Sequence, residues 1–379
     1  MRRNRILSSV FVLAALPLSV NAEGLERFNI DPGFLFGEGN TANLSFASVN
    51  PSIGATSGSA LINLEDGLEV APSFSALNLS VKTSVNDKID LGLFYSNSGN
   101  GVLIDWGTIS GLATSANVTI GADLKMPTLA AFGKYKINDN ISVFGGLKRT
   151  TVNDGAFAKV ARDLDGNGTL DETSHWVLSE TSEMGMVYGA AYEMPEIALR
   201  VSLMIEDDID LEIATTGNGI IPAATGTSTA SIGDAMTLHF QSGIAEDTLL
   251  FGSIRSSNWE DNQVFVPLSA AAGGGTAQLS SFEDGMSYSL GIGRKINDEL
   301  SLSISAFYDG GDGNDTSELS PTGANRSISF GGRYAIADNA NLSGGINYSM
   351  RGDSTTENLG AVLNDSSVMT IGASIAFEF

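Results

Sequence analysis

In this 379-residue sequence, the residues whose types and spacing best suit a chemical role form an acidic segment in the first half. Oxygen-bearing side chains stand at the first, third and fifth positions of a calcium-loop pattern, and glycine stands at the sixth. The predicted calcium ligands are Asp163, Asp165, Asn167, Thr169 and Asp171. Position twelve is Ser174 instead of a glutamate, although Glu172 lies close by, so a calcium site and a solvated acidic loop are both open interpretations.

Residues suited to catalysis are few. The chain has two histidines and no cysteine, which excludes thiolate chemistry and disulfides. His175 stands in a polar stretch, and His239 is expected inside the barrel predicted below, away from the lipid-facing position of a membrane-embedded hydrolase. The run Gly273–Gly275 is followed by no predicted helix, so it is a flexible loop and not a phosphate cradle. We therefore expect no enzymatic activity and no cofactor beyond the calcium ion.

The first 22 residues have the pattern of a secretory signal peptide. Residues 1–5 are basic, residues 6–20 are mostly apolar, and small residues at 20–22 provide a cleavage site. The apolar stretch is too short for a membrane helix, and no later stretch approaches the ~18–20 apolar residues that one needs. We expect an exported chain that crosses a membrane, if at all, with strands. Its net charge of −24 argues against a nucleic-acid partner.

One short unit recurs along the sequence: a tight polar turn followed by a strand with alternating apolar and small polar residues. The clearest copy is 296–308, and similar turns stand at 85–88, 137–140, 193–196, 244–247 and 336–339. The alternation predicts fourteen strands, over 42–53, 73–85, 89–96, 128–137, 141–152, 182–192, 196–212, 233–243, 247–259, 283–295, 299–308, 325–336, 340–350 and 367–379.

Short turns alternate with long polar connections between these strands, which is the asymmetry of an outer-membrane barrel. The last strand supports this interpretation, because Met369, Ile371, Ile375 and Phe377 share one face and the chain ends on Phe379. Such a terminal strand resembles the signal that the barrel assembly machinery reads. The sequence thus predicts an all-β fold, a fourteen-stranded antiparallel transmembrane β-barrel over 42–379, with a short N-terminal plug segment, the hatch, over 23–41.

Strand register predicts which side chains face the barrel lumen. The inward positions combine glycine and serine with several phenylalanines and a few cations. Aromatic groups with nearby bases suit an amphipathic anion such as a fatty acid, whereas interior packing and ion pairs with lumenal acids are the alternative roles. The predicted ligand-binding residues are Phe34, Phe36, Phe94, Phe144, Lys148, Arg200, Met204, Phe251, Arg255, Phe307 and Arg333.

The strand number, the hatch and several local stretches resemble the FadL/TodX family of outer-membrane transporters, in its short-hatch form. These stretches are 195–201, 244–255, 289–294 and 319–323. The resemblance implies capture of a hydrophobic ligand by outer loops, passage to a lumenal site, and sideways release at a kink in the third strand. Here that strand is interrupted by Ser96, Asn97, Gly99 and Gly101, which are the candidates for a lateral opening, with a plain loop as the alternative. The hatch is short, and only Asn50-Pro51-Ser52 is similar to the family's Asn-Pro-Ala element.

The function that this resemblance implies is passive uptake of long-chain fatty acids or other hydrophobic compounds across the outer membrane of a Gram-negative cell. The alternative is a diffusion porin for small polar solutes. The expected partners are hydrophobic, fatty-acid-like small molecules, outer-membrane lipid and the barrel assembly machinery. We expect a monomer.

Overall fold

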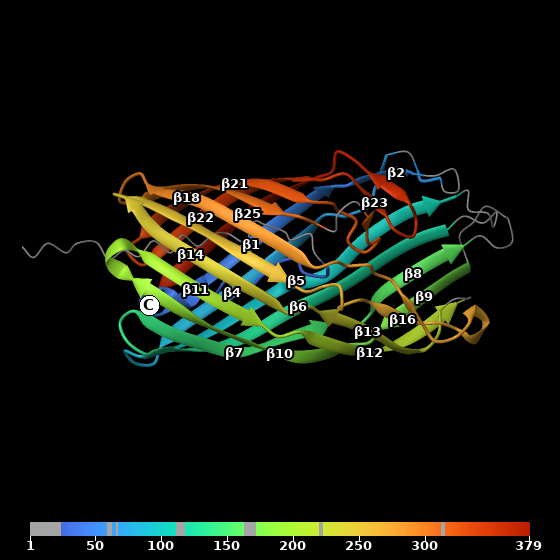
Figure 1. Ribbon diagram of the computed structural model, residues 1–379, viewed down its shortest axis with the longest axis horizontal. Helices are drawn as coiled ribbons and strands as arrows, with labels where there is room; N and C mark the ends of the chain where they lie inside the picture. The colour runs from blue at the N-terminus through green and yellow to red at the C-terminus, as the bar shows by residue number, and fades with distance from the viewer. Residues whose placement is uncertain are drawn as a thin grey trace, which may run out of the picture.

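The computed structural model describes residues 24–58, 63–65, 67–110, 118–162, 172–219, 223–311 and 315–379. Within these ranges, fourteen antiparallel strands close into one barrel, as the sequence predicted (Figure 1). The wall consists of β1 (Thr41–Ser52), β4 (Phe74–Ser84), β5 (Ile89–Ile109), β6 (Val118–Lys136), β7 (Ile141–Val152), β10 (Thr181–Met194), β11 (Leu199–Glu206), β14 (Ala235–Ala245), β15 (Thr248–Ser257), β18 (Gly285–Lys295), β19 (Leu300–Asp309), β21 (Asn325–Ala337), β22 (Ala340–Arg351) and β25 (Ser367–Glu378). β25 pairs with β1, which closes the wall.

Short strands extend and cover the end of the barrel opposite the C-terminus (Figure 1). They are β2 (Gly54–Ser57), β3 (Leu68–Glu69), β8 (Ala156–Arg162), β9 (Glu172–Leu178), β12 (Ile209–Gly219), β13 (Gly226–Ile232), β16 (Phe265–Pro267), β17 (Thr276–Gln278), β20 (Asp315–Thr316), β23 (Ser354–Thr356) and β24 (Ala361–Leu363). The 3₁₀ helices are η1 (Pro32–Phe36), η2 (Pro195–Ile197) and η3 (Ala270–Ala272). In the part of the chain that the structure describes, no helix has the length and apolar character needed to cross a membrane.

Two predicted boundaries differ from the structure. Residues 97–127 were expected to form a loop, but β5 and β6 remain paired as far as Ile109 and Val118, well beyond the other wall strands. The strand predicted over 196–212 divides at Asp207 into β11, which pairs with β14, and β12, which pairs with β9 and β13. In both places the chain leaves the barrel wall and continues as part of an outer hairpin, a change that local alternation does not reveal.

Three of the six recurring turns share one hydrogen-bond pattern. The side-chain Oδ1 of Asn297 accepts hydrogen bonds from the backbone N–H groups of Glu299 and Leu300, at 3.0 and 2.8 Å. Asn86 and Asn138 make the same pair of bonds in their own turns. Asparagine is suited to this position because its short side chain can satisfy its own backbone two residues further on. The repeated turn residues therefore set the register of the hairpins that follow.

We predict that Asn297→Ala destabilises the barrel by roughly 1 kcal/mol, since two backbone donors lose their acceptor. Urea unfolding in lipid vesicles measures the change. Asp298→Ala in the same turn is the control, because Asp298 is 97% exposed in its ion pair with Lys295 and such pairs stabilise little. Equal destabilisation by the two variants would contradict a specific role for the asparagine.

The outer face of the barrel is apolar, as the predicted register requires. On β19, Leu302, Ile304 and Tyr308 are 46%, 43% and 44% exposed, whereas Ser301, just before Leu302, is 8% exposed. The same alternation holds on β7, where Ile141, Val143 and Leu147 are exposed and Phe144 and Lys148 are buried. A barrel with an apolar exterior and a polar interior is the arrangement that a bilayer demands.

The hatch lies inside the barrel from Gly24 onward. Leu25, Phe28, Ile30, Leu35 and Phe36 are each buried. Its helix η1 begins after Asp31, whose Oδ1 accepts a hydrogen bond from the N–H of Gly33 at 2.7 Å, and Pro32 occupies the first helical position. The hatch gives way to β1 at Thr41. The predicted signal peptide over 1–22 and the first hatch residue lie outside the described residues.

Candidate functional site

The apolar wall of the lumen packs directly against the hatch. The ring of Phe34 lies 5.9 Å from Phe132 and 6.5 Å from Phe94, and the ring of Phe36 lies 6.0 Å from Phe144 in an edge-on arrangement. Together these side chains form what we call the hatch cluster: Ile30, Phe34, Leu35, Phe36, Phe94, Ala130, Phe132, Phe144, Val187, Ala191 and Met204. Five of the predicted ligand-binding residues are therefore occupied by packing between the hatch and β5, β6, β7, β10 and β11.

A buried ion network joins the start of the hatch to the wall. Arg255 donates from Nη2 to Glu26 Oε1 at 2.7 Å and from Nη1 to Glu206 Oε2 at 2.8 Å. The other carboxylate oxygen of Glu206 accepts a hydrogen bond from Lys148 Nζ at 2.9 Å. Two cations and two anions are thus paired in the lumen, and Lys148 and Arg255 take the alternative role of ion pairs with lumenal acids.

A second set of cations holds the other end of the hatch. Lys82 and Lys134 both contact Asp90, at 3.7 and 3.0 Å. Lys82 Nζ also donates to the carbonyl of Gly37 at 2.6 Å, and Lys134 Nζ donates to the carbonyl of Leu35. These contacts fix the backbone just after η1. Neither lysine was among the predicted site residues, because the carbonyls that they contact belong to the hatch, whose path no sequence periodicity indicates.

Arg200 on β11 contacts both the hatch and the neighbouring strand β14. Its guanidinium carbon lies 4.7 Å from the centre of the Phe36 ring, and its Nη2 donates to Gln241 Oε1 at 2.9 Å. On its other side it lines two cavities that meet between the hatch and strands β11 to β22.

The larger cavity, of about 850 Å³, lies at the end of the barrel with the short turns. Phe34, Phe94, Arg200 and Arg333 line it, together with acidic turn residues such as Asp298. The hydrogen bond and the charge of the Lys295 ammonium, at 2.7 Å, lower the pKa of Asp298 below its ordinary range. The smaller cavity, of about 260 Å³, lies deeper in the lumen. It is lined by Phe251, Arg255, Phe307, Arg333 and several serines.

The wall is interrupted at the run proposed as a lateral opening. The pairing of β4 with β5 ends at the pair Asn78–Ser96. On the other side of β5, the pair Ser96–Thr128 with β6 is followed by the pair Asn100–Met126, so three residues of β5 are skipped and one of β6. Residues 97–99 therefore face only Pro127, which has no N–H to offer. The chain continues as strand on both sides, so residues 97–99 form a bulge within β5, and their role as a lateral opening stays a prediction.

The hatch takes up the hydrogen bonds that the wall lacks at this interruption. The N–H groups of Arg27 and Phe28 donate to the carbonyl of Gly99 at 2.9 and 3.0 Å, and the N–H of Gly101 donates to Leu25 at 2.7 Å. Gly101 has a φ of +136°, which L side chains rarely adopt. Burial lowers the pKa of Arg27 to about 10, so it stays protonated at neutral pH beside the ring of Phe74.

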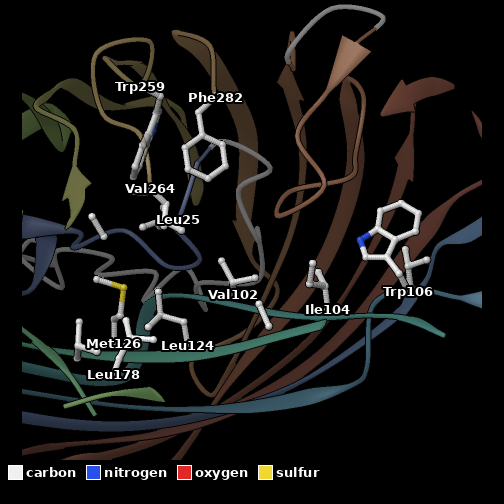
Figure 2. Close-up of a cluster of buried hydrophobic side chains, with 14 of the residues drawn as sticks. Leu25, Val102, Ile104, Trp106, Leu124, Met126, Leu178, Trp259, Val264 and Phe282 are labelled. Carbon is white, nitrogen blue, oxygen red and sulfur yellow. The ribbon is translucent and has the colours of Figure 1, made fainter. Parts of the chain in front are cut away.

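A second apolar cluster, the outer cluster, fills the lumen on the other side of the hatch (Figure 2). Leu25 from the hatch lies beneath Trp259, Val264 and Phe282, and residues from the extended parts of β5 and β6 complete it. Sequence reasoning missed this cluster because Val102, Ile104 and Trp106 fell in a range predicted to be loop. Their spacing of two, with apolar side chains on one face, was the available signal.

The calcium interpretation is not tested, since Asp163, Asp165, Asn167, Thr169 and Asp171 lie outside the described residues. Among the residues that the structure does describe, no three acidic or histidine side chains come together in a way that could hold a metal ion. His239 faces the lumen, as predicted, and lines the smaller cavity.

Comparison with known structures defines the fold. No protein-family model matches the chain, and a search of curated proteins finds no match. Among solved structures, a Pseudomonas aeruginosa FadL homologue is 13% identical, with a TM-score of 0.71 over 95% of this chain and 96% of that chain. The Pseudomonas putida toluene transporter TodX is 16% identical, with a TM-score of 0.64 over 96% of each chain. The Ralstonia pickettii toluene transporter TbuX is 12% identical, with a TM-score of 0.58 over 96% of this chain and 98% of that chain.

These likenesses extend over nearly the whole chain and show a hatch-containing barrel of the FadL/TodX fold.

Proposed function

We propose that this protein is a passive uptake channel of the outer membrane for hydrophobic compounds, such as aromatic hydrocarbons or long-chain fatty acids. The observation that carries the proposal is a lumen filled by its own N-terminal segment beside a wall that is broken at residues 97–99. In an aqueous pore, a segment in the lumen would obstruct the flow of water, and a break in the wall would not serve solutes that stay in water. The neighbouring structures, named as a FadL homologue and as toluene transporters, support the same class of cargo.

The proposed route enters among the outer strands and reaches the smaller cavity, where Phe251 and Phe307 offer apolar faces. Release is proposed to occur sideways through the break between β4 and β5, at Ser96, Asn97, Gly99 and Gly101. A hydrophobic molecule that leaves there enters the bilayer directly, so its apolar surface never returns to water.

The alternative, a diffusion porin for polar solutes, draws support from the hydroxyl-rich wall around both cavities. The hatch and the outer cluster oppose it, because together they place buried apolar side chains across the lumen. Swelling of protein-containing liposomes in sugars separates these two functions.

We further propose that the protein is exported by its signal peptide and inserted as a monomer by the barrel assembly machinery. Phe377 near the end of β25 and Phe379 just after it are the aromatic residues that this machinery is expected to read. Both side chains are exposed.

The lateral route predicts that closing the wall break stops uptake. Leu77 and Asn97 face each other across it, with the Leu77 N–H bonded to Asn97 Oδ1 at 2.7 Å. Because the chain has no cysteine, the pair L77C/N97C forms one defined disulfide on oxidation. We expect uptake of p-xylene into cells or vesicles to fall to background in the oxidised variant and to recover when a reductant is added.

The single variants L77C and N97C are the controls, since neither can close the break. Uptake that is unchanged by oxidation of the pair would contradict lateral release while leaving the transport function intact. A wild-type protein that transports no more p-xylene than empty vesicles would contradict the transport function itself.

A further inference from the structure

The smaller cavity has an unusual wall for a hydrophobic site. Its inward positions on β18 and β19 are Ser287, Ser289, Ser301, Ser303 and Ser305, and Asn29 and Ile30 of the hatch close one side. At about 260 Å³ it lies at the lower end of the size of small-molecule sites, so its guest is a compact molecule of roughly one ring.

Four serines of this lining have little exposed surface, and their side chains line the cavity. Ser202, Ser287, Ser301 and Ser343 are 2%, 5%, 8% and 8% exposed. No hydrogen bond joins their side chains to another group in the described part of the chain. A guest that displaces water from the cavity must therefore exchange hydrogen bonds with these hydroxyl groups or leave them unpaired, which is costly.

Two aromatic rings complete the site. Phe251 faces Gly291 across the β15–β18 pair, and Gly291 faces Ser305 across the β18–β19 pair. A Cβ atom at Gly291 would meet the Phe251 ring and the Ser305 Cβ at 2.5 and 2.7 Å, so glycine lets the ring lie against the wall. Phe251 and Phe307 thereby present apolar surface beside the serine hydroxyls, which is the combination that an aromatic ring with a polar substituent needs.

The charges of the lining favour a neutral guest. Arg255 contacts the carboxylates of both Glu26 and Glu206, so its positive charge is already compensated. Arg200 and Arg333 also line the cavity, and each interacts electrostatically with a carboxylate, Asp31 for Arg200 and Glu378 for Arg333, so the three arginines all have acidic partners. The serines can donate as well as accept, and a hydroxyl group matches both capacities.

We propose that the smaller cavity selects a compact neutral aromatic molecule that carries a hydroxyl group, such as a phenol, over the hydrocarbon of the same shape. This selectivity rests on the proposed uptake of hydrophobic compounds and narrows it to a substrate class. A hydrocarbon guest that displaced water would leave the serine hydroxyls of the cavity unpaired, whereas a phenolic hydroxyl pairs with them, and sites built in this way reject the analogue that lacks the polar group.

The test compares p-cresol with p-xylene, which differ by one hydroxyl in place of a methyl group. Binding of each to the purified full-length protein in detergent is measured by calorimetry. We expect p-cresol to bind at least tenfold more tightly, which corresponds to about 1.4 kcal/mol. In the triple variant S301A/S303A/S305A, we expect the preference to fall about tenfold, through weaker binding of p-cresol with p-xylene unchanged or tighter.

Ser374→Ala is the matched control, because Ser374 is an equally buried inward serine that lines neither cavity. It should keep the full preference. Equal affinity for the two compounds in the wild-type protein, or a preference that survives in the triple variant, would overturn the proposed selectivity and leave hydrophobic uptake standing. Failure of both compounds to bind, with no uptake of either into vesicles, would overturn the uptake function as well.

Discussion

Glu206→Gln is expected to destabilise the folded barrel by about 3–5 kcal/mol, because it leaves two buried cations with one carboxylate between them. Glu206 is 2% exposed and contacts both Lys148 and Arg255. The glutamine amide has nearly the same shape and still offers one acceptor, so the loss is chiefly one of charge. Urea unfolding of the protein in lipid vesicles gives the change in the free energy of unfolding.

The network also predicts a rescue. Lys148 has Glu206 as its ion-pair partner, whereas Arg255 retains Glu26 after the substitution. Replacing the lysine in the double variant E206Q/K148M therefore restores a neutral interior, and we expect the double variant to be more stable than E206Q alone.

Glu183→Gln on β10 is the control for loss of a carboxylate, since Glu183 is exposed and makes no ion pair among the described residues. We expect it to leave stability nearly unchanged. An E206Q barrel as stable as the wild type, or a double variant less stable than E206Q, would show that Lys148 and Arg255 are compensated by something other than this carboxylate.

Much of the fold could be predicted because its signals are local. Each wall strand shows the period-two pattern, and turns such as that of Asn297 carry their own hydrogen-bond acceptor within three residues. The lumenal positions of Phe144, Phe251 and Arg333 followed from register alone. The register holds because a one-residue slip would place every apolar side chain in the lumen.

The contents of the lumen could not be predicted in the same way. The bond between Glu26 and Arg255 joins residues 229 positions apart, and the hatch that makes it has no periodicity to indicate its path. The sequence therefore predicted that Phe36, Phe144 and Met204 bind a ligand. In the structure these side chains belong to the hatch cluster, in which the hatch packs against the barrel wall. The inward serines looked unremarkable as alternating polar residues, and only the cavity that they share distinguishes them.

Gly92→Leu is expected to lift η1 from the wall without unfolding the barrel. A Cβ atom at position 92 would collide with the Leu35 side chain and lie 2.8 Å from Cε2 of Phe34, so the larger leucine side chain occupies the place where both now pack. The burial of these two side chains stabilises the docked hatch by ~3 kcal/mol or more. Losing ~3 kcal/mol raises the population of the undocked hatch about 100-fold.

Hydrogen–deuterium exchange measures this directly, through the backbone amides of residues 33–37. We expect their exchange to accelerate about 100-fold in G92L, with a smaller effect in G92A, because the ends of the Leu35 and Phe34 side chains can yield to a single methyl group. Amides of the wall strands should exchange as slowly as before. Gly133→Leu is the control on the neighbouring strand, since a side chain there meets nothing within 4 Å.

The same experiment separates the two ends of the hatch. Glu26 is held by Arg255, far along the hatch from η1, so amides near Glu26 should stay protected in G92L while those of η1 exchange. A hatch that exchanges along its whole length would mean that η1 and the ion network dock as one unit. Unchanged exchange in η1 would mean that the side chains of Leu35 and Phe34 repack elsewhere on the wall. The packing over Gly92 would then not be what keeps the hatch docked.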